Sequence, residues 1–271
     1  MDRTALVTAL VTGASSGIGK ATAAALVARG YKVVGTSRQP ASLTAEQRVD
    51  GVEYRPLDLG DEASIEALAG GVGPVDVLVN NAGESQSGPF EELPPDALQR
   101  LFQVNVLGPV RLTQLLLPGM RERRRGRVVM VGSMLASFPL AYRSSYVASK
   151  AALKGFSDGA RHEYSPFGVW LTTVEPGSIN TGISQRRTKY ISEGSPHRVE
   201  FERMLAALDR NERSGASAER VAATIVGAIE APRPKAHYAV GSNAQIVFPL
   251  RRLLPSRLVE KATHRRHDLR R

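Results

Sequence analysis

Seven short apolar segments, rich in β-branched residues, alternate along the chain with longer segments of helical periodicity. Most of the apolar segments are continuous, which is typical of strands buried on both faces of a parallel sheet. The predicted strands are Leu6–Thr12, Lys32–Ser37, Gly51–Leu57, Val75–Asn80, Arg127–Gly132, Val169–Val174 and His237–Val240. The predicted helices are Gly17–Arg29, Glu62–Leu68, Pro94–Val104, Val106–Glu122, Tyr146–Tyr164 and Ala218–Ala231. This order predicts a single α/β domain, a doubly wound parallel sheet of about seven strands with helices on both faces.

Two regions depart from this alternation. Residues 177–215 mix turn formers, charged residues and one predicted helix, Arg198–Arg210. An irregular insertion of this length is commonly functional, so we predict a substrate-binding lid here. Residues 244–271 form a basic amphipathic extension whose apolar side should dock on the main domain, residues 1–243, or on a second subunit. Its apolar residues are Ile246, Val247, Phe248, Leu250, Leu253, Leu254, Leu258 and Val259.

The composition removes several classes of chemistry. The chain has 271 residues, 42% of them hydrophobic, which is enough for a full core. It has no cysteine, which excludes disulfides, thiolate metal ligands and thiol catalysis, and we expect no metal site. The apolar stretch near the N-terminus is too short to span a membrane, so we expect a soluble, cytoplasmic protein.

The formal net charge of +10 is concentrated in two places. Residues 251–271 hold eight Lys or Arg against Glu260 and Asp268, and residues 121–127 hold five arginines against Glu122. A high charge can indicate nucleic-acid binding, but these residues are not interleaved with aromatics and no DNA-binding motif accompanies them. A solvated basic tail explains the charge better, with contact to an acidic partner or an anionic membrane surface as the alternative.

A glycine-rich loop, TGASSGIGK, runs from Thr12 to Lys20 between the first predicted strand and the first predicted helix. Glycines here permit a tight turn and let a pyrophosphate approach the backbone, while the helix N-terminus would stabilise its charge. A purely structural turn is the alternative. The position between strand and helix favours a dinucleotide site that includes Gly13, Ser15, Ser16, Gly17, Ile18 and Gly19.

The residues after the second and third strands bear on the choice of cofactor. The second strand ends at Ser37 and Arg38, with no acidic residue before Glu46. An acidic side chain here would bind a ribose 2′-hydroxyl, whereas an arginine suits a 2′-phosphate, so NADP(H) is favoured over NAD(H). Arg38 could also be an ordinary solvent-facing residue. Asp58, followed by Leu59, could accept a hydrogen bond from the adenine amino group or could cap a turn.

Tyr146 and Lys150 are four residues apart in a predicted helix, so they share a face. The ammonium group would favour the ionised form of the phenol and make it a proton donor and acceptor near neutral pH. An ordinary amphipathic helix would explain the same pair. The surrounding motifs must decide between the two.

Those motifs occur in an order that resembles the short-chain dehydrogenase/reductase family in its single-domain form. The matching pieces are Thr12 to Gly19, Asp58, Asn80-Asn81-Ala82-Gly83, Asn105, Ser133, Tyr146-x-x-x-Lys150 and Pro176-Gly177, over about the first 180 residues. Each motif alone is weak, but their order is the context that supports such motifs. The resemblance implies a Rossmann-like fold and an NADP(H)-binding, catalytic main domain.

The resemblance also implies a catalytic set of Asn105, Ser133, Tyr146 and Lys150. Tyr146 would protonate a carbonyl oxygen while hydride arrives from the nicotinamide, and Ser133 would be the second donor to that oxygen. Lys150 would assist Tyr146 and bind the nicotinamide ribose, and Asn105 would hold a water that passes protons to Lys150. Ser133 could otherwise cap a turn, and Asn105 could satisfy buried backbone groups.

Further cofactor contacts follow from the same resemblance. Asn81, Ala82 and Gly83 would line the adenosine and ribose side of the cleft, although an ordinary strand-end turn also fits them. Pro176, Gly177, Ile179 and Thr181 would lie near the nicotinamide, with Thr181 able to bind its carboxamide.

The C-terminal stretch resembles the 17β-hydroxysteroid and retinol dehydrogenase branch of that family. This implies a hydrophobic ketone or secondary alcohol, steroid-, retinoid- or polyketide-like, and contact with a membrane surface. Met134, Leu135, Phe138, Pro139 and Leu140 could wall an apolar pocket, although core packing explains them equally well.

The leading hypothesis is an NADPH-dependent carbonyl reductase that also runs as an alcohol dehydrogenase. The alternatives are a non-catalytic NADP(H) sensor on the same fold and a basic surface-binding protein. By analogy with the family, we expect a homo-oligomer, a dimer or a tetramer.

Overall fold

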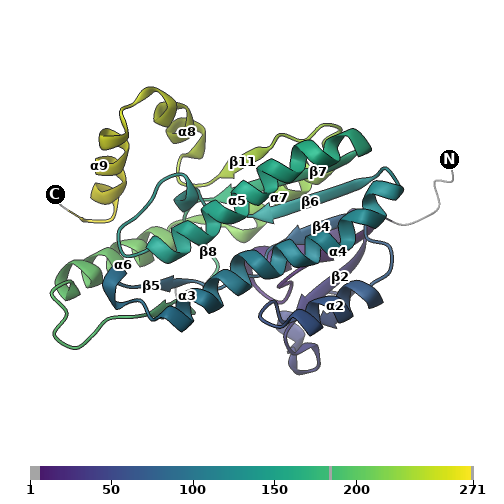
Figure 1. Cartoon of the computed structure of the whole chain (residues 1–271), viewed down its shortest axis with the longest axis horizontal. Helices are drawn as coiled ribbons and strands as arrows, with labels where there is room; N and C mark the ends of the chain where they lie inside the picture. Colours follow the sequence, from purple (N-terminus) through teal and green to yellow (C-terminus); the bar gives the residue numbers. More distant parts are fainter. Residues whose placement is uncertain (1–6, 183–184, 270–271) are drawn as a thin grey trace.

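The computed structural model describes residues 7–182 and 185–269, and a seven-stranded parallel sheet forms its centre (Figure 1). The strands of this sheet are β1 (Thr8–Val11), β2 (Lys32–Ser37), β3 (Val52–Pro56), β4 (Val77–Asn80), β6 (Gly126–Val131), β7 (Val169–Pro176) and β11 (His237–Val240). Their order across the sheet is β3-β2-β1-β4-β6-β7-β11. In register, Val11 of β1 lies between Gly35 of β2 and Val79 of β4. The predicted doubly wound Rossmann-like sheet is confirmed; Leu6, predicted to open the first strand, lies outside the described residues.

Helices cover both faces of the sheet. The helices are α1 (Gly17–Val27), α2 (Glu62–Gly71), α3 (Pro95–Phe102), α4 (Gly108–Glu122), α5 (Ser144–Tyr164), α6 (Arg198–Arg213), α7 (Ala218–Glu230), α8 (Ala244–Leu253) and α9 (Ser256–Arg266). One apolar core lies between the sheet and α2, α4 and α5, and includes Leu78, Leu112 and Leu153. A second core lies between the sheet and α1 and α7, and includes Leu26 and Ile225. The continuous apolar strands therefore have a core on each face, as the sequence predicts.

The chain between α3 and α4 differs from the sequence prediction of two separate helices. A π-helical stretch, Gln103–Leu107, joins α3 to α4 without a break. Wide turns of this kind are frequent at functional sites. Here the stretch holds Asn105, which is 1% exposed and faces the interior.

The region predicted as a lid is held down by two short strand pairs. β8 (Ile179–Asn180) pairs with β10 (Ala216–Ser217), and β5 (Gln86–Ser87) pairs with β9 (Thr188–Lys189). A third core joins α6 to the end of the chain through Phe201, Met204 and Leu269. The predicted helix of the lid is α6, which extends to Arg213.

The C-terminal extension forms a helical hairpin, α8–α9, that stands over the β8 and α6 end of the molecule (Figure 1). None of the described helices is long and apolar enough to cross a membrane.

Candidate active site

The glycine-rich loop follows β1 and leads into α1 at the point where the strand order reverses, between β1 and β4. Thr36 of β2 fixes this loop: its Oγ1 accepts a hydrogen bond from the Gly13 amide at 3.2 Å, and its carbonyl accepts one from Ala14 at 3.0 Å. Gly13 and Gly17 have φ values of +67° and +51°, which favour glycine. A crevice at such a switch point is where open α/β sheets bind ligands.

Gly19, in the first turn of α1, packs closely against the backbone of the glycine-rich loop. A Cβ atom at this residue would lie 2.2 Å from the Gly13 carbonyl oxygen and 2.4 Å from Asn81 Nδ2. Asn81 Nδ2 itself donates to the Thr12 carbonyl at 2.9 Å, and the Asn81 amide donates to Thr12 Oγ1 at the same distance. Asn81 therefore ties the ends of β1 and β4 together, and Gly19 leaves room for that contact; of the two only Asn81 lines the cleft.

A cleft of about 470 Å³ extends from this loop along the carboxyl ends of the strands. Sixteen of the predicted cofactor residues line it: Gly13, Ser15, Ser16, Gly17, Ile18, Ser37, Arg38, Asp58, Leu59, Asn81, Ala82, Gly83, Tyr146, Lys150, Pro176 and Thr181. Gly177 and Ile179, predicted for the same site, line the neighbouring apolar cavity instead. The glycine cradle, the free N-terminus of α1 and the polar lining fit a dinucleotide.

Some residues of this cleft were not singled out from the sequence. Thr36 and Gln47 lie beside Arg38, and Glu84 and Arg186 also line the cleft. Arg186 belongs to a charged cluster that the sequence shows plainly, but only the fold brings it across the chain to the cleft. Asp58 lines the cleft and also accepts a hydrogen bond from the Gly60 amide at 2.8 Å, so it does cap a turn.

Asn105 and Lys150 both approach Gly83; Lys150 lines the cleft, whereas Asn105 lies behind that lining. Asn105 Oδ1 accepts a hydrogen bond from the Glu84 amide at 2.8 Å, and its Nδ2 donates to the Glu84 carbonyl at 3.0 Å. Lys150 Nζ donates to the carbonyl of Val131 at 3.0 Å. A Cβ at Gly83 would lie 2.9 Å from Asn105 Oδ1 and 3.6 Å from Lys150 Nζ, so these groups converge beside Gly83. Asn105 thus has the structural role considered from the sequence and also lies next to the lysine.

Tyr146 lies between two charged side chains and is 8% exposed. Lys150 Nζ lies 5.8 Å and Arg143 Cζ 4.3 Å from the centre of its ring. Both the tyrosine and the lysine come from α5, as their spacing predicts. The arginine comes from the turn just before that helix and was not anticipated.

Arg143 is a buried cation held by one small loop. Its Nη1 donates to Ser85 Oγ at 3.0 Å, to the Gln86 carbonyl at 2.8 Å and to Ser87 Oγ at 3.0 Å. Burial, reinforced by the nearby charge of Arg187, lowers the pKa of Arg143 to about 10. Arg143 thereby ties the strand β5 to the start of α5 and to the face of Tyr146.

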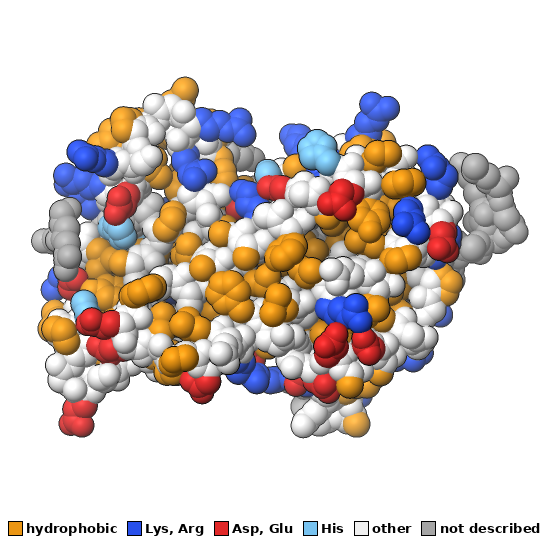
Figure 2. Space-filling view, viewed as in Figure 1, with side chains coloured by type: hydrophobic (Ala, Val, Ile, Leu, Met, Phe, Trp, Pro, Cys, Tyr) orange, Lys and Arg blue, Asp and Glu red, His pale blue; other side chains and the backbone are white. Residues whose placement is uncertain are grey.

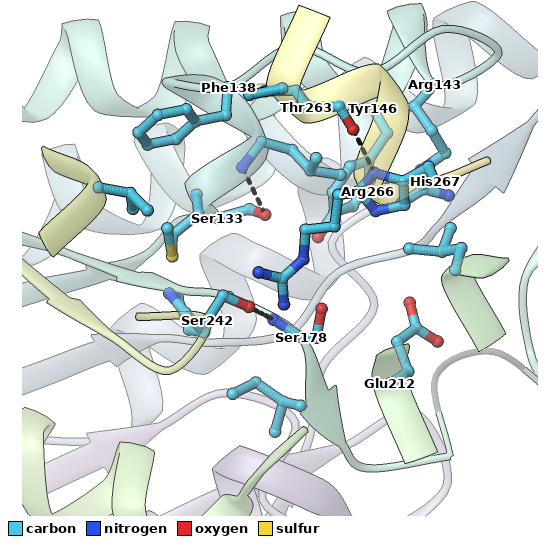
Figure 3. A pocket seen from close by; sticks show the side chains of 18 of the residues that line it. Ser133, Phe138, Arg143, Tyr146, Ser178, Glu212, Ser242, Thr263, Arg266 and His267 are labelled. Atoms are coloured by element: carbon cyan, nitrogen blue, oxygen red, sulfur yellow. Dashed lines mark hydrogen bonds between the residues drawn. The ribbon is translucent and has the colours of Figure 1, made fainter. Parts of the chain in front are cut away.

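A second cavity, of about 380 Å³, adjoins the cleft (Figure 3). Its walls are mainly apolar, and include Met134, Leu135 and Phe138, which the sequence offered as pocket residues. The C-terminal hairpin supplies much of the rest: Val247, Leu250, Arg251, Leu254, Val259, Ala262, Thr263, Arg266 and His267. Arg266 extends its side chain from α9 into the cavity, toward Ser178 (Figure 3). The sequence predicts the hairpin's amphipathic character but not that it covers the cavity.

Ser133 faces this apolar cavity at the end of β6. Its Oγ accepts a hydrogen bond from the Leu135 amide at 3.2 Å, the local capping role considered from the sequence (Figure 3). That bond uses a lone pair of the hydroxyl oxygen, so the hydroxyl hydrogen can still be donated to a ligand in the cavity.

Glu212 and His267 line the apolar cavity, and behind Glu212 lies a buried group of charged side chains. Arg187, with a fully buried side chain, pairs with Asp209 at 2.8 Å and with Glu212 at 2.5 Å. Burial raises the pKa of Glu212, although the charge of Arg187 opposes this. His267 is 6% exposed, and burial lowers its pKa. These pairs attach the segment before β9 to α6, which carries Glu212 at the cavity wall.

Four residues line both cavities: Ile18, Pro176, Thr181 and, as the one phenol among them, Tyr146. Its side chain lines both of them, whereas Lys150 lines only the dinucleotide cleft and Ser133 only the apolar cavity. The Tyr146 phenol therefore lies at the boundary between a cofactor-sized space and a substrate-sized one.

Comparisons with known proteins agree with this geometry. Residues 7–191 match the short chain dehydrogenase family. The chain belongs to that family. It is therefore an oxidoreductase of the short-chain type, as the resemblance of its motifs predicts.

Individual relatives cover nearly the whole chain. The chain is 31% identical over 241 residues to a 3-ketodihydrosphingosine reductase of Bacteroides thetaiotaomicron, covering 88% of this chain and 89% of that protein. A short-chain dehydrogenase from Streptomyces avermitilis has a crystal structure similar over 98% of both chains, with a TM-score of 0.80 and 36% identity. A short-chain dehydrogenase from Sphingobium yanoikuyae, in complex with NADPH, matches over 92% of both chains with a TM-score of 0.73 and 25% identity.

Proposed function

We propose that this protein is an NADPH-dependent carbonyl reductase, and in reverse an alcohol dehydrogenase, acting on a hydrophobic ketone or secondary alcohol. The observation that carries the proposal is the position of Tyr146, whose side chain lines both the dinucleotide cleft and the apolar cavity. Bound NADPH would supply the hydride. The remaining chemistry belongs to side chains of this protein.

Three side chains would handle the carbonyl oxygen and its proton. Ser133 donates a hydrogen bond to the oxygen from the apolar side, which stabilises the negative charge that develops there. Tyr146 donates the proton as a general acid. Lys150 lies on the cofactor side, where its ammonium stabilises the phenolate that remains.

The apolar cavity supports the substrate class. It is walled by Met134, Leu135, Phe138 and the apolar side chains of α8 and α9, and such a lining binds hydrophobic molecules with a few polar groups to orient them. The relative from Bacteroides thetaiotaomicron is named a 3-ketodihydrosphingosine reductase, and the substrate in that name is also a ketone. A ketone with a long or bulky apolar group is the substrate that we infer.

The decisive experiment replaces Tyr146 by Phe. Removing the general acid should lower kcat by about 10²- to 10⁴-fold while NADPH still binds. Oxidation of NADPH with a panel of apolar ketones measures the first effect, and quenching of protein fluorescence by NADPH measures the second. Tyr164→Phe, on the same helix but outside both cavities, is the matched control and should keep wild-type turnover.

Undiminished turnover in Tyr146→Phe would contradict the proposed role of the phenol. If the wild-type protein binds NADPH but oxidises it with no ketone in the panel, a non-catalytic NADP(H)-binding sensor becomes the better account. The intact set of Ser133, Tyr146 and Lys150 favours the enzyme.

The preference for NADP(H) rests on Arg38, which is exposed at the rim of the cleft next to Ser37. A charge-assisted hydrogen bond to a 2′-phosphate contributes about 1.5–3 kcal/mol, so Arg38→Asp should shift the ratio of kcat/KM values toward NAD(H) by about 10- to 100-fold or more. Arg48→Asp, on a neighbouring loop but outside the cleft, is the control. If the protein uses both cofactors equally before and after the change, Arg38 does not bind the 2′-phosphate.

A further inference from the structure

The outer surface of the α8–α9 hairpin is unusually apolar for a surface that faces solvent. Five large apolar side chains are exposed there: Ile246 by 60%, Leu250 by 42%, Leu253 by 80%, Leu254 by 41% and Leu258 by 51%. They are accompanied by exposed cations at positions 251, 252, 257, 261 and 265. Figure 2 shows the two kinds of side chain together at the upper left, with apolar atoms at the tip of the hairpin and Lys or Arg on its flanks.

The same hairpin walls the apolar cavity of the active site. Leu250 and Leu254 line the cavity and are also about two-fifths exposed, so they lie at its mouth. Phe248 packs edge-on against Phe138 with ring centres 5.2 Å apart, which fixes α8 to the chain segment that follows Ser133. The exposed apolar surface is therefore continuous with the route into the cavity.

We propose that the α8–α9 hairpin, Ala244 to Arg266, docks on an anionic lipid surface. Its leucines would enter the boundary between headgroups and acyl chains, and its arginines and Lys261 would contact lipid phosphates. The hairpin lies in the plane of the interface, because its helices are short and none of the described helices can span a bilayer. A further consequence rests on the proposed function: an apolar substrate passes directly from the lipid to the mouth of the apolar cavity at Leu250 and Leu254.

The positive charge of this face disfavours binding of a second copy of this chain to it. Glu260 is the one acidic residue between Ala244 and Arg266, and Asp268, just beyond the hairpin, is paired with Arg210 of α6. Two such faces in contact would bring like charges together without partners, which opposes association. A negatively charged bilayer complements the same charges.

Vesicle sedimentation tests the docking without cofactor or substrate, so its outcome is independent of turnover. The full chain should bind vesicles of phosphatidylcholine mixed with phosphatidylglycerol, should bind phosphatidylcholine alone at least about ten-fold more weakly, and should be released by salt. Leu253→Glu, and separately the pair Arg252→Gln and Arg257→Gln, should each weaken binding by about ten-fold or more. Leu253 is 80% exposed, so its replacement leaves the fold intact.

Matched controls use equally exposed residues elsewhere. Val199→Glu changes an apolar residue of α6 that is 68% exposed, and the pair Arg220→Gln and Arg233→Gln removes two exposed charges away from the hairpin. Both controls should bind vesicles like the wild type.

Several results would overturn the proposal. Equal binding to neutral and anionic vesicles would do so, as would wild-type binding by the Leu253 and Arg252/Arg257 variants. If the protein does not bind vesicles, and the wild type is a dimer whereas the Leu253→Glu variant is a monomer, the face is a subunit interface instead. Absence of vesicle binding together with salt-sensitive retention on DNA would make it a nucleic-acid surface.

Discussion

At the scale of single residues, the site depends on close approach of backbone segments as much as on reactive side chains. Gly19 has no reactive group, yet it allows the Gly13 carbonyl to pass within 2.2 Å of the place where a Cβ would be. Under the proposed function, Tyr146 and Ser133 would act on a substrate only if the glycine-rich loop holds the cofactor beside them. A residue that merely leaves space is thus part of the active site.

This role of Gly19 leads to a prediction. Gly19→Ala should destabilise the protein by about 1–3 kcal/mol and weaken NADPH binding, because the added methyl group meets backbone that cannot move freely. Thermal unfolding and a binding titration measure the two effects. Gly155→Ala, in α5 where nothing lies within 4 Å of the new Cβ, should instead stabilise the protein by about 0.5–1 kcal/mol. A Gly19→Ala protein as stable as Gly155→Ala, with normal binding, would show that the loop can relax.

The candidate catalytic residues are predictable from the sequence because each stands at a fixed place relative to a strand or helix. Tyr146 and Lys150 share a helix face, and the glycine loop lies between a strand and a helix. Arg143 and Arg186 could not be found this way. Arg143 donates a hydrogen bond to Ser85, and Arg186 lines the same cleft as the glycine-rich loop. Both placements involve residues distant in the sequence, which no local pattern encodes.

At the scale of elements, α9 depends on a buried imidazole. His267 ends that helix, and its ring nitrogen Nδ1 contacts the Thr263 carbonyl at 2.8 Å. Burial lowers the pKa of His267 below its ordinary value of 6.5. The contact with the Thr263 carbonyl opposes this shift, and the charges of Arg266, His264 and Arg143 reinforce it. The folded state therefore binds this proton less readily than the unfolded state does.

The consequence is a loss of stability in mild acid. The contribution of His267 is fully present above about pH 6.5 and is lost as the pH falls from there through the lower pKa of the folded state. Buried Glu212, whose pKa is raised, acts in the opposite sense, so a comparison of variants is needed. Between about pH 7.5 and pH 5.5 the melting temperature of His267→Gln should fall less than that of the wild type. His162→Gln, at an exposed position in α5, should keep the wild-type slope; equal slopes for all three proteins would contradict the role of His267.

The order and type of the main helices and strands follow from the apolar pattern, but the conformation of the segments that connect them does not. The sequence predicts separate helices before and after residue 105, whereas a π-helical stretch joins them. Helical periodicity cannot distinguish a short break from one wide turn, because both shift the apolar face by about the same angle. That turn fixes the position of Asn105, so the contacts of Asn105 could not be predicted from the sequence.

At the scale of the whole molecule, the C-terminal extension completes the site that the main domain begins. The carboxyl ends of the strands provide the cleft and Ser133, while α8 and α9 close the apolar cavity above them. The sequence separates these parts by more than a hundred residues, and an amphipathic helix gives no sign of which surface it covers. Contacts made in the fold fix that choice, among them the packing of Phe248 on Phe138 and of Leu269 on α6.

The shared wall at Tyr146 also has a consequence for handedness. Under the proposed function, a ketone in the apolar cavity would have its oxygen between Ser133 and Tyr146, and only one face of its flat carbonyl group would turn toward the cleft. Hydrogen would then arrive on that face alone, and an unsymmetrical ketone should give one mirror-image form of the alcohol in large excess. Chromatography of the product on a chiral column measures this ratio, and an equal mixture of the two forms would mean that the cavity does not fix the orientation of its ligand.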